Sequence, residues 1–210
     1  MANFIRLNNF LGTALRDELL NFAIASESAF LPTTIGTASG GETNPSVRRS
    51  VRIVDIGDFR AIVERRVQQV IPDLTRDLRL SPFETGQIEI EMVAHADGGF
   101  YTRHIDTFTG KNRTESGDRV ISCVYYFFTE PKSFSGGELR LHPLPTKADP
   151  VPTAIDVTIT NDTLIAFSSW LPHEVLPVSN PSTAFVDSRF SINCWVYQVP
   201  RTRAASSGSK

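Results

Sequence analysis

The N-terminal part of the chain shows hydrophobic spacing typical of helices. Within residues 9–24, apolar positions recur at near-helical intervals behind Asn9, which can cap the first turn, so we predict an amphipathic helix. Residues 58–79 repeat this pattern, and we expect the helix there to break or restart at Pro72. Between the two, residues 30–48 lack periodicity and predict a long loop of the lid or binding kind, followed by a short strand at 50–55.

From residue 80 onward the pattern changes to short strands separated by turn residues. We predict eight strands, at 87–95, 99–106, 118–128, 137–142, 155–159, 163–168, 172–178 and 188–198. Strands at this spacing with no helices between them indicate an antiparallel jelly roll, mainly β with buttressing N-terminal α-helices. We expect one structural domain, comprising residues 1–80 packed on a core of 81–200 and a flexible tail at 201–210, without internal repeats.

The strand predicted at 188–198 separates polar and apolar residues. One face carries Phe190 and the apolar positions that alternate with it, and the other carries Arg189, Ser191, Asn193 and Trp195. An edge strand with one wet face would show the same pattern. Alternatively, helices cover the apolar face and the polar residues line a cavity between two sheets.

The strand at 118–128 is largely apolar on both faces, which is typical of a central strand. Ser122 and Tyr126 place two hydroxyl groups on one of these faces. A buried hydroxyl group needs a hydrogen-bond partner, and a ligand is one candidate.

His104 and Asp106 point the same way in an extended chain, so they must share one environment. With a second, distant His they would form a 2-His-1-carboxylate triad, which holds Fe(II) and leaves coordination positions open. The pair alone is weak evidence. Of the remaining histidines, His173 follows a strand and a turn and is the favoured third ligand, whereas we interpret His95 as a pocket neighbour and His142 as a surface residue.

An iron site that uses a dicarboxylate keto acid also needs a fixed cation for the far carboxylate, and Arg binds both oxygens of a carboxylate. Arg189 lies sixteen residues after His173, with Ser191 on the same strand face as a second donor. Taken alone, Arg189 is better interpreted as an exposed residue in a salt bridge with Asp187. The combination with the histidines favours the ligand-binding interpretation.

Composition limits the class of protein further. The 210 residues carry a net charge of −2, which gives no basic field for nucleic acid. No apolar run suits a signal peptide or a membrane span, so we expect a cytoplasmic protein that binds neither nucleic acid nor membrane. Cys123 and Cys194 are too few for a disulfide framework or a zinc cluster, and we interpret them as buried thiols.

Five segments occur in the order and approximate spacing of one known family: "YTRHID", "VISCVYYF", "SGGELRLHP", "LIAFSSWLPHEVLPV" and "SRFSINCWVY". Over residues 80–200 the chain resembles the Fe(II)- and 2-oxoglutarate-dependent oxygenases, most closely the prolyl hydroxylases of the oxygen-sensing type and their bacterial relatives. The resemblance implies a double-stranded β-helix. It also implies Fe(II) as cofactor, 2-oxoglutarate and O2 as co-substrates, and allows ascorbate as a reductant.

The resemblance implies a role for each site residue. Iron would be held by His104, Asp106 and His173. The far carboxylate of 2-oxoglutarate would bind Arg189 and Tyr126, helped by Ser122 and Ser191. The pocket wall would include Leu139, Trp195, Asn193, His95 and Tyr101, and the turn into a barrel strand would be made by Gly136 and Gly137.

The implied reaction couples decarboxylation of 2-oxoglutarate to succinate with hydroxylation of a C–H bond. The carboxylate of Asp106 favours hydroxylation over halogenation, because halogenating relatives carry a small residue there. The chain departs from the oxygen-sensing enzymes in two places that concern the substrate. Residues 174–188 form a longer segment than in those enzymes, and His95 and Ala96 stand where they carry a pocket tyrosine. We expect a protein or peptide residue, most plausibly proline, as substrate. The alternatives are a free amino acid or other small metabolite, and a non-catalytic binding module.

Overall fold

Two antiparallel sheets face each other in the computed structural model, which describes residues 4–37, 40–107 and 117–200. The larger sheet has seven strands in the order β1-β13-β9-β16-β7-β6-β2. These strands are β1 (Phe4–Asn8), β2 (Leu31–Pro32), β6 (Val51–Ile53), β7 (Thr85–His95), β9 (Arg119–Phe127), β13 (Thr163–Ser168) and β16 (Arg189–Gln198). The mainly β, double-stranded β-helix prediction is confirmed.

The smaller sheet has five strands in the order β12-β11-β14-β8-β5. They are β5 (Arg48–Arg49), β8 (Phe100–His104), β11 (Leu139–Leu141), β12 (Ile155–Val157) and β14 (His173–Val175). Two further pairs of strands are β3 (Ile35–Thr37) with β4 (Gly40–Glu42), and β10 (Ser135–Gly136) with β15 (Val178–Ser179). Short 3-10 helices occupy Glu27–Ala29 and Phe185–Asp187. The predicted loop at 30–48 therefore contains short strands.

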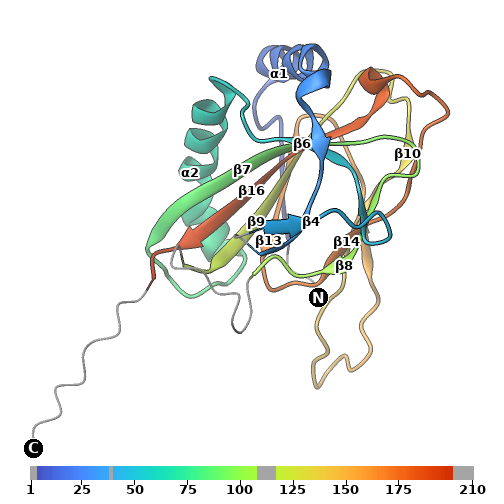
Figure 1. Ribbon diagram of the computed structural model, residues 1–210. Helices are drawn as coiled ribbons and strands as arrows, with labels where there is room; N and C mark the ends of the chain where they lie inside the picture. Colours follow the sequence, from blue (N-terminus) through green and yellow to red (C-terminus); the bar gives the residue numbers. More distant parts are fainter. Residues whose placement is uncertain (1–3, 38–39, 108–116, 201–210) are drawn as a thin grey trace, which may run out of the picture.

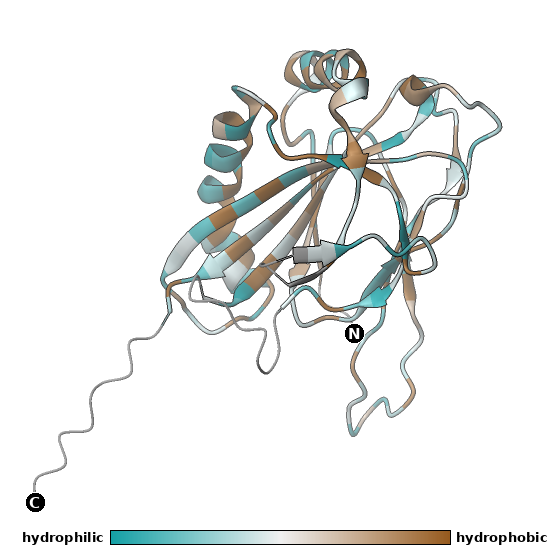
Figure 2. Ribbon diagram, in the orientation of Figure 1, coloured by the Kyte–Doolittle hydropathy of each residue, from teal (hydrophilic) through white to brown (hydrophobic). Residues whose placement is uncertain are grey.

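Helices α1 (Thr13–Ala25) and α2 (Phe59–Asp77) cover the outer face of the larger sheet (Figure 1). Their buried residues form one apolar core with the strands beneath, including Leu19, Val63, Val67 and Leu74. Bands of apolar and polar residues alternate along the strands and helices in Figure 2, as a buried face and an exposed face require. Neither helix in the described ranges is long and apolar enough to cross a membrane.

The two faces of β16 border different parts of the interior, an apolar core and a polar pocket. Phe190, Ile192, Cys194 and Val196 lie in the core shared with the helices, whereas Arg189, Ser191, Asn193 and Trp195 line a pocket between the sheets. Because β16 pairs with β7 on one side and β9 on the other, it is a central strand. The edge-strand interpretation is therefore wrong, and the cavity interpretation is confirmed.

Two predictions about the helices are wrong. Asn9 does not cap α1: the helix begins at Thr13, and the backbone N–H groups of Leu11 and Gly12 bind the Asp162 carboxylate at 2.9 and 3.0 Å. A carboxylate from a distant turn thus holds the backbone just before the helix. Pro72 does not interrupt α2, which runs through it, because Ile71 and Leu74 anchor the helix to the core on both sides of the proline.

The other predicted strands agree with the structure to within three residues at each end. The strand predicted at 99–106 ends earlier, at His104, so Asp106 lies in the bend that follows. Most of the polar loop after it and the tail at 201–210 lie outside the described residues. The division of the chain at residue 80 stays a prediction.

Candidate active site

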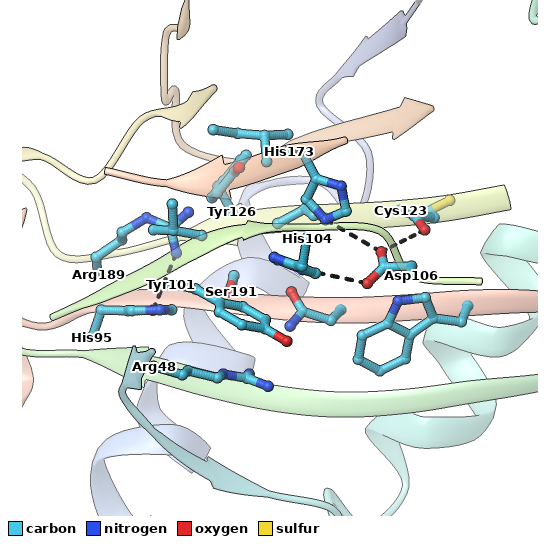
Figure 3. A pocket seen from close by; sticks show the side chains of 16 residues that line it. Arg48, His95, Tyr101, His104, Asp106, Cys123, Tyr126, His173, Arg189 and Ser191 are labelled. Carbon is cyan, nitrogen blue, oxygen red and sulfur yellow. Dashed lines mark hydrogen bonds and ion pairs between the residues drawn. The ribbon is translucent and has the colours of Figure 1, made fainter. Parts of the chain in front are cut away.

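Three candidate metal ligands meet where β8 and β14 pair. His173 lies directly opposite His104 in the antiparallel ladder, and Asp106 follows His104 by two residues. The Nε2 atoms of His104 and His173 lie 3.5 and 3.4 Å from the two carboxylate oxygens of Asp106 (Figure 3). Ligand atoms from the three residues all lie within 4.8 Å of one another. Sheet pairing therefore brings together residues that are about seventy positions apart in the sequence.

Backbone hydrogen bonds fix which imidazole nitrogens carry protons. His104 Nδ1 lies 2.8 Å from the Thr102 carbonyl oxygen, and His173 Nδ1 lies 2.8 Å from that of Leu171. A carbonyl oxygen only accepts, so each Nδ1 must donate its hydrogen, and a neutral ring then presents an Nε2 lone pair toward Asp106. Two nitrogen lone pairs and a carboxylate that converge in this way fit a divalent metal ion such as Fe(II).

The surroundings keep these groups in the protonation states that bind a metal. Burial lowers the pKa of His173 to about 4, with Asp106 partly opposing this, so the ring is neutral near pH 7. Burial alone would raise the pKa of Asp106. The neighbouring His173 and His104, with the Ser122 hydroxyl, outweigh burial and hold the pKa of that carboxyl well below its usual range.

A second cluster occupies the buried end of the same pocket. Arg189 is 1% exposed, and its Nε donates to the Gly137 carbonyl at 2.8 Å. Its Nη1 donates to His95 Nδ1 at 3.3 Å, and its guanidinium lies 4.9 Å from the centroid of the Tyr126 ring. The alternative salt bridge from Arg189 to Asp187 is wrong, since no described carboxylate forms an ion pair with this guanidinium.

Three polar atoms in this cluster have no hydrogen-bond partner within the described part of the chain: Arg189 Nη2, the Tyr126 hydroxyl and His95 Nε2. Burial raises the pKa of the Tyr126 phenol, so the hydroxyl keeps its proton and can donate. Orphaned buried donors are costly. A cation and a hydroxyl group left in this state fit a carboxylate ligand, such as one end of 2-oxoglutarate.

The turn at Gly136 and Gly137 supports this cluster. Both glycines have positive φ, of 68° and 71°. A Cβ atom on Gly137 would lie 2.7 Å from Arg189 Cδ, so a larger residue would push against the guanidinium stem. Glycine at this position allows the backbone to approach Arg189 closely enough to accept its Nε–H.

All twelve residues expected at the site line one pocket. Ser122 lies at its metal end: the hydroxyl donates to Asp106 Oδ2 at 2.6 Å and is 2.9 Å from Ser169 Oγ. Tyr101 stacks on His104 with ring centroids 3.6 Å apart. His142, in contrast, lies 2.9 Å from Glu174 through its Nε2 and does not join the triad.

The sequence interpretation missed four residues that line the pocket: Arg48, Cys123, Val124 and Val175. Arg48 is the last residue of the predicted loop at 30–48, which has no periodicity, so no local pattern marked it as a pocket residue. Its buried partner Glu91 carried a usable signal, because it shares a polar strand face with Glu89 and His95, opposite a face that is apolar throughout.

Fold and site together define a class, the double-stranded β-helix proteins with a candidate 2-His-1-carboxylate metal site. The model of the 2OG-Fe(II) oxygenase superfamily matches residues 90–197, just over half of the 210 residues. The chain belongs to this superfamily. Its members use Fe(II), 2-oxoglutarate and O2, which fit the two clusters described above.

One relative is an uncharacterised PKHD-type hydroxylase of Synechocystis sp., 35% identical over 193 residues. The alignment covers 90% of this chain and 61% of that protein, so the chain spans less than two thirds of this relative's length.

Two solved structures share the fold. A Pseudomonas putida prolyl-4-hydroxylase aligns with a TM-score of 0.67 and 22% identity over 94% of each chain. A prolyl hydroxylase from Trichoplax adhaerens, in complex with a peptide fragment of hypoxia inducible factor, aligns with a TM-score of 0.66 and 23% identity, covering 94% of this chain and 84% of that one.

Proposed function

We propose that this protein is an Fe(II)- and 2-oxoglutarate-dependent hydroxylase. His104, Asp106 and His173 hold the metal, and Arg189 with Tyr126 binds the far carboxylate of 2-oxoglutarate. The observation that carries the proposal is the pairing of a three-ligand site with an uncompensated buried arginine in one pocket. When bound, iron would activate O2 with 2-oxoglutarate as co-substrate: the keto acid would lose CO2 and take one oxygen atom to become succinate, and the other oxygen atom would enter a substrate C–H bond.

The chain's own residues would position and shield the reaction. Backbone carbonyls fix the histidine tautomers, and Ser122 holds one carboxylate oxygen of Asp106. Arg189 orients the co-substrate from the buried end. Tyr101 and Trp195 wall the metal side of the pocket, and Leu139 and Ser191 line it between the sheets.

For the primary substrate we propose a residue of a protein or peptide, with proline as the first choice. The two solved structures of the same fold support this, since both are prolyl hydroxylases and one holds a peptide. A free amino acid is the second candidate, favoured by a cationic side chain, Arg48, in the pocket wall. Ascorbate as a reductant and a cytoplasmic location stay predictions.

The test measures succinate formation and oxygen uptake with Fe(II) and 2-oxoglutarate. We expect His104→Ala to abolish turnover. Arg189→Ala should raise the 2-oxoglutarate concentration needed by about 10- to 100-fold, because charge-assisted hydrogen bonds contribute about 1.5–3 kcal/mol. Arg140→Ala is the matched control, since this half-buried arginine of β11 pairs with Asp156 of the edge strand β12 and does not line the pocket.

Wild-type turnover no higher than that of His104→Ala would refute the hydroxylase proposal. For the substrate, proline-containing peptides and free L-proline are incubated with the active enzyme and analysed by mass spectrometry. A gain of one oxygen on the peptide supports the first candidate, and a gain on the free amino acid supports the second.

A further inference from the structure

A buried charge cluster lies in the wall of the pocket beside the metal ligands. Glu91, on β7, is 4% exposed. Its carboxylate binds two arginines, Arg48 Nη2 at 3.1 Å and Arg52 Nη1 at 2.9 Å. Asn193, directly opposite Glu91 in the ladder between β16 and β7, also donates to it at 3.3 Å. One carboxylate thus serves two guanidinium groups.

This cluster has a net charge of one positive unit, because two arginines share a single carboxylate. Burying charges costs free energy, so this charged cluster is not explained by a contribution to the stability of the fold. Arg52 can disperse its charge into solvent, since a third of its side chain is exposed, whereas the Arg48 side chain is 9% exposed. The excess charge is therefore presented at Arg48, which lines the pocket.

Three contacts hold Arg48 in one orientation. Its Nη2 binds Glu91, its Nε donates to Ser50 Oγ at 3.1 Å, and its guanidinium lies 4.8 Å from the Tyr101 ring centroid. Tyr101 in turn stacks on His104, so Arg48, Tyr101 and His104 form successive layers (Figure 3). Among the described residues, none accepts a hydrogen bond from Arg48 Nη1. A fixed guanidinium with a free edge is suited to bind a carboxylate.

We propose that Arg48, oriented by Glu91, binds a carboxylate group of the primary substrate. This inference rests on the proposed function, because it concerns the substrate of the same pocket. There, Arg189 takes one carboxylate of 2-oxoglutarate and the metal takes the other, so the charge at Arg48 is left for a different ligand. The carboxylate comes either from a free amino acid or from an acidic side chain next to the hydroxylated residue of a peptide.

The experiment compares acids with their neutral amides by calorimetric titration of the enzyme with Fe(II) and 2-oxoglutarate under nitrogen. One pair of probes is L-proline and L-prolinamide. The other is the blocked peptide Ala-Pro-Glu-Ala and its counterpart Ala-Pro-Gln-Ala. In at least one pair we expect the acid to bind about tenfold more tightly or better, as one charge-assisted contact provides. The pair that discriminates identifies the source of the carboxylate.

Substitutions then assign the preference to Arg48. Arg48→Gln should reduce the acid-to-amide affinity ratio to about one, and Arg48→Lys should leave a smaller preference of the same sign, since lysine keeps the charge but lacks the fork. Arg49→Gln is the matched control: this exposed neighbour lies over the Phe100 ring, and the variant should keep the wild-type ratio. Thermal melting checks that each variant folds.

Equal affinity of wild type for acid and amide in both pairs, or no binding of either, overturns the inference. So does an unchanged preference in folded Arg48→Gln. Because titration under nitrogen involves no turnover, these outcomes differ from failure of the proposed function, which shows as wild-type succinate formation no higher than that of His104→Ala. Acid preference without succinate formation would support this inference and refute the hydroxylase proposal.

Discussion

At the scale of single residues, a short relay of hydroxyl groups orients the carboxylate of the metal site. Ser122 has one hydroxyl proton, and it goes to Asp106 because an ionised carboxylate only accepts. The bond between Ser122 and Ser169 must then be donated by Ser169. Asp106 is also held through its backbone, whose N–H donates to the Ser169 carbonyl at 3.0 Å. Ser169 therefore supports Asp106 by two routes.

Replacing Ser122 by alanine should weaken metal binding without removing a metal ligand. The variant loses the hydrogen bond that orients Asp106, and outer-shell partners of this kind typically contribute about 10- to 100-fold to metal affinity. We expect a loss of about tenfold, measured by titration with Co(II) followed by its visible absorption. Ser133→Ala is the control, since Ser133 donates to the Asp187 carbonyl and lies outside the pocket lining. Equal Co(II) affinity of Ser122→Ala and wild type would contradict this role.

The residues that could be predicted from sequence are those whose chemistry is readable in short patterns. His104 and Asp106 stand two positions apart, and Arg189 stands on a strand that alternates cleanly. The carboxylate-orienting contact of Ser122 could not be predicted, because it depends on how far β9 lies from the bend after β8. Arg48 was missed for a similar reason: its position is fixed by Glu91 and Tyr101, which are distant in sequence.

At the scale of elements, the turn between β10 and β11 sets the position of Arg189. Gly137 accepts the Arg189 Nε–H and leaves no room for a Cβ atom beside the arginine stem. Gly12, before α1, also has positive φ, of 87°, but a Cβ atom there would meet nothing within 4 Å. Substitutions at Gly12 and Gly137 would therefore both strain the backbone, but only a substitution at Gly137 would also create a steric clash.

Gly137→Ala should impair both stability and co-substrate binding, whereas Gly12→Ala should impair stability alone. Alanine at positive φ costs about 1–2 kcal/mol in either variant. At Gly137 the new methyl group also displaces the guanidinium of Arg189. Urea unfolding measures the first effect, and calorimetric titration with 2-oxoglutarate measures the second. If Gly137→Ala bound 2-oxoglutarate as tightly as Gly12→Ala does, the turn would not position Arg189.

Element boundaries were predictable where apolar and polar residues alternate, as in β7 and β16, and where a short apolar run lies between turn residues, as in β9 and β13. They were not predictable for β2 and β5, which are two residues long and exist only because they pair with β6 and β8. The start of α1 was not predictable either, because the backbone just before it is held by Asp162, some 150 positions away in sequence. Local patterns carry no information about such partners.

At the scale of the whole molecule, a polar pocket is enclosed between apolar layers. One core joins the helices to the larger sheet, and a second, smaller core joins the two sheets beside the pocket, including Phe134, Leu141 and Phe167. His95 and Arg189, at the buried end of this pocket, are consequently cut off from water. Burial lowers the pKa of His95 well below its usual value, and the charges of Arg189 and Arg48 lower it further.

The stability of the protein should therefore fall in mild acid partly through His95. Above about pH 6.5 this residue is neutral in both the folded and unfolded states, so it contributes no pH dependence. Below that pH the unfolded chain binds a proton that the folded protein excludes, which favours unfolding. Between pH 6.5 and 5.5 we expect wild type to lose about 1 kcal/mol more than His95→Gln, measured as the free energy of unfolding in urea. Parallel pH profiles for the two proteins would contradict this.

The two cysteines give this architecture a practical use. Cys123 and Cys194 lie opposite each other on β9 and β16, in the core beneath the helices, and burial raises the pKa of the Cys123 thiol to about 12. A thiol-reactive dye at neutral pH can reach Cys194 only when helices and sheet separate, whereas Cys123 also lines the pocket. The rate of labelling at Cys194 would then report how often the helices and the larger sheet separate, and each variant above carries this probe without an added label.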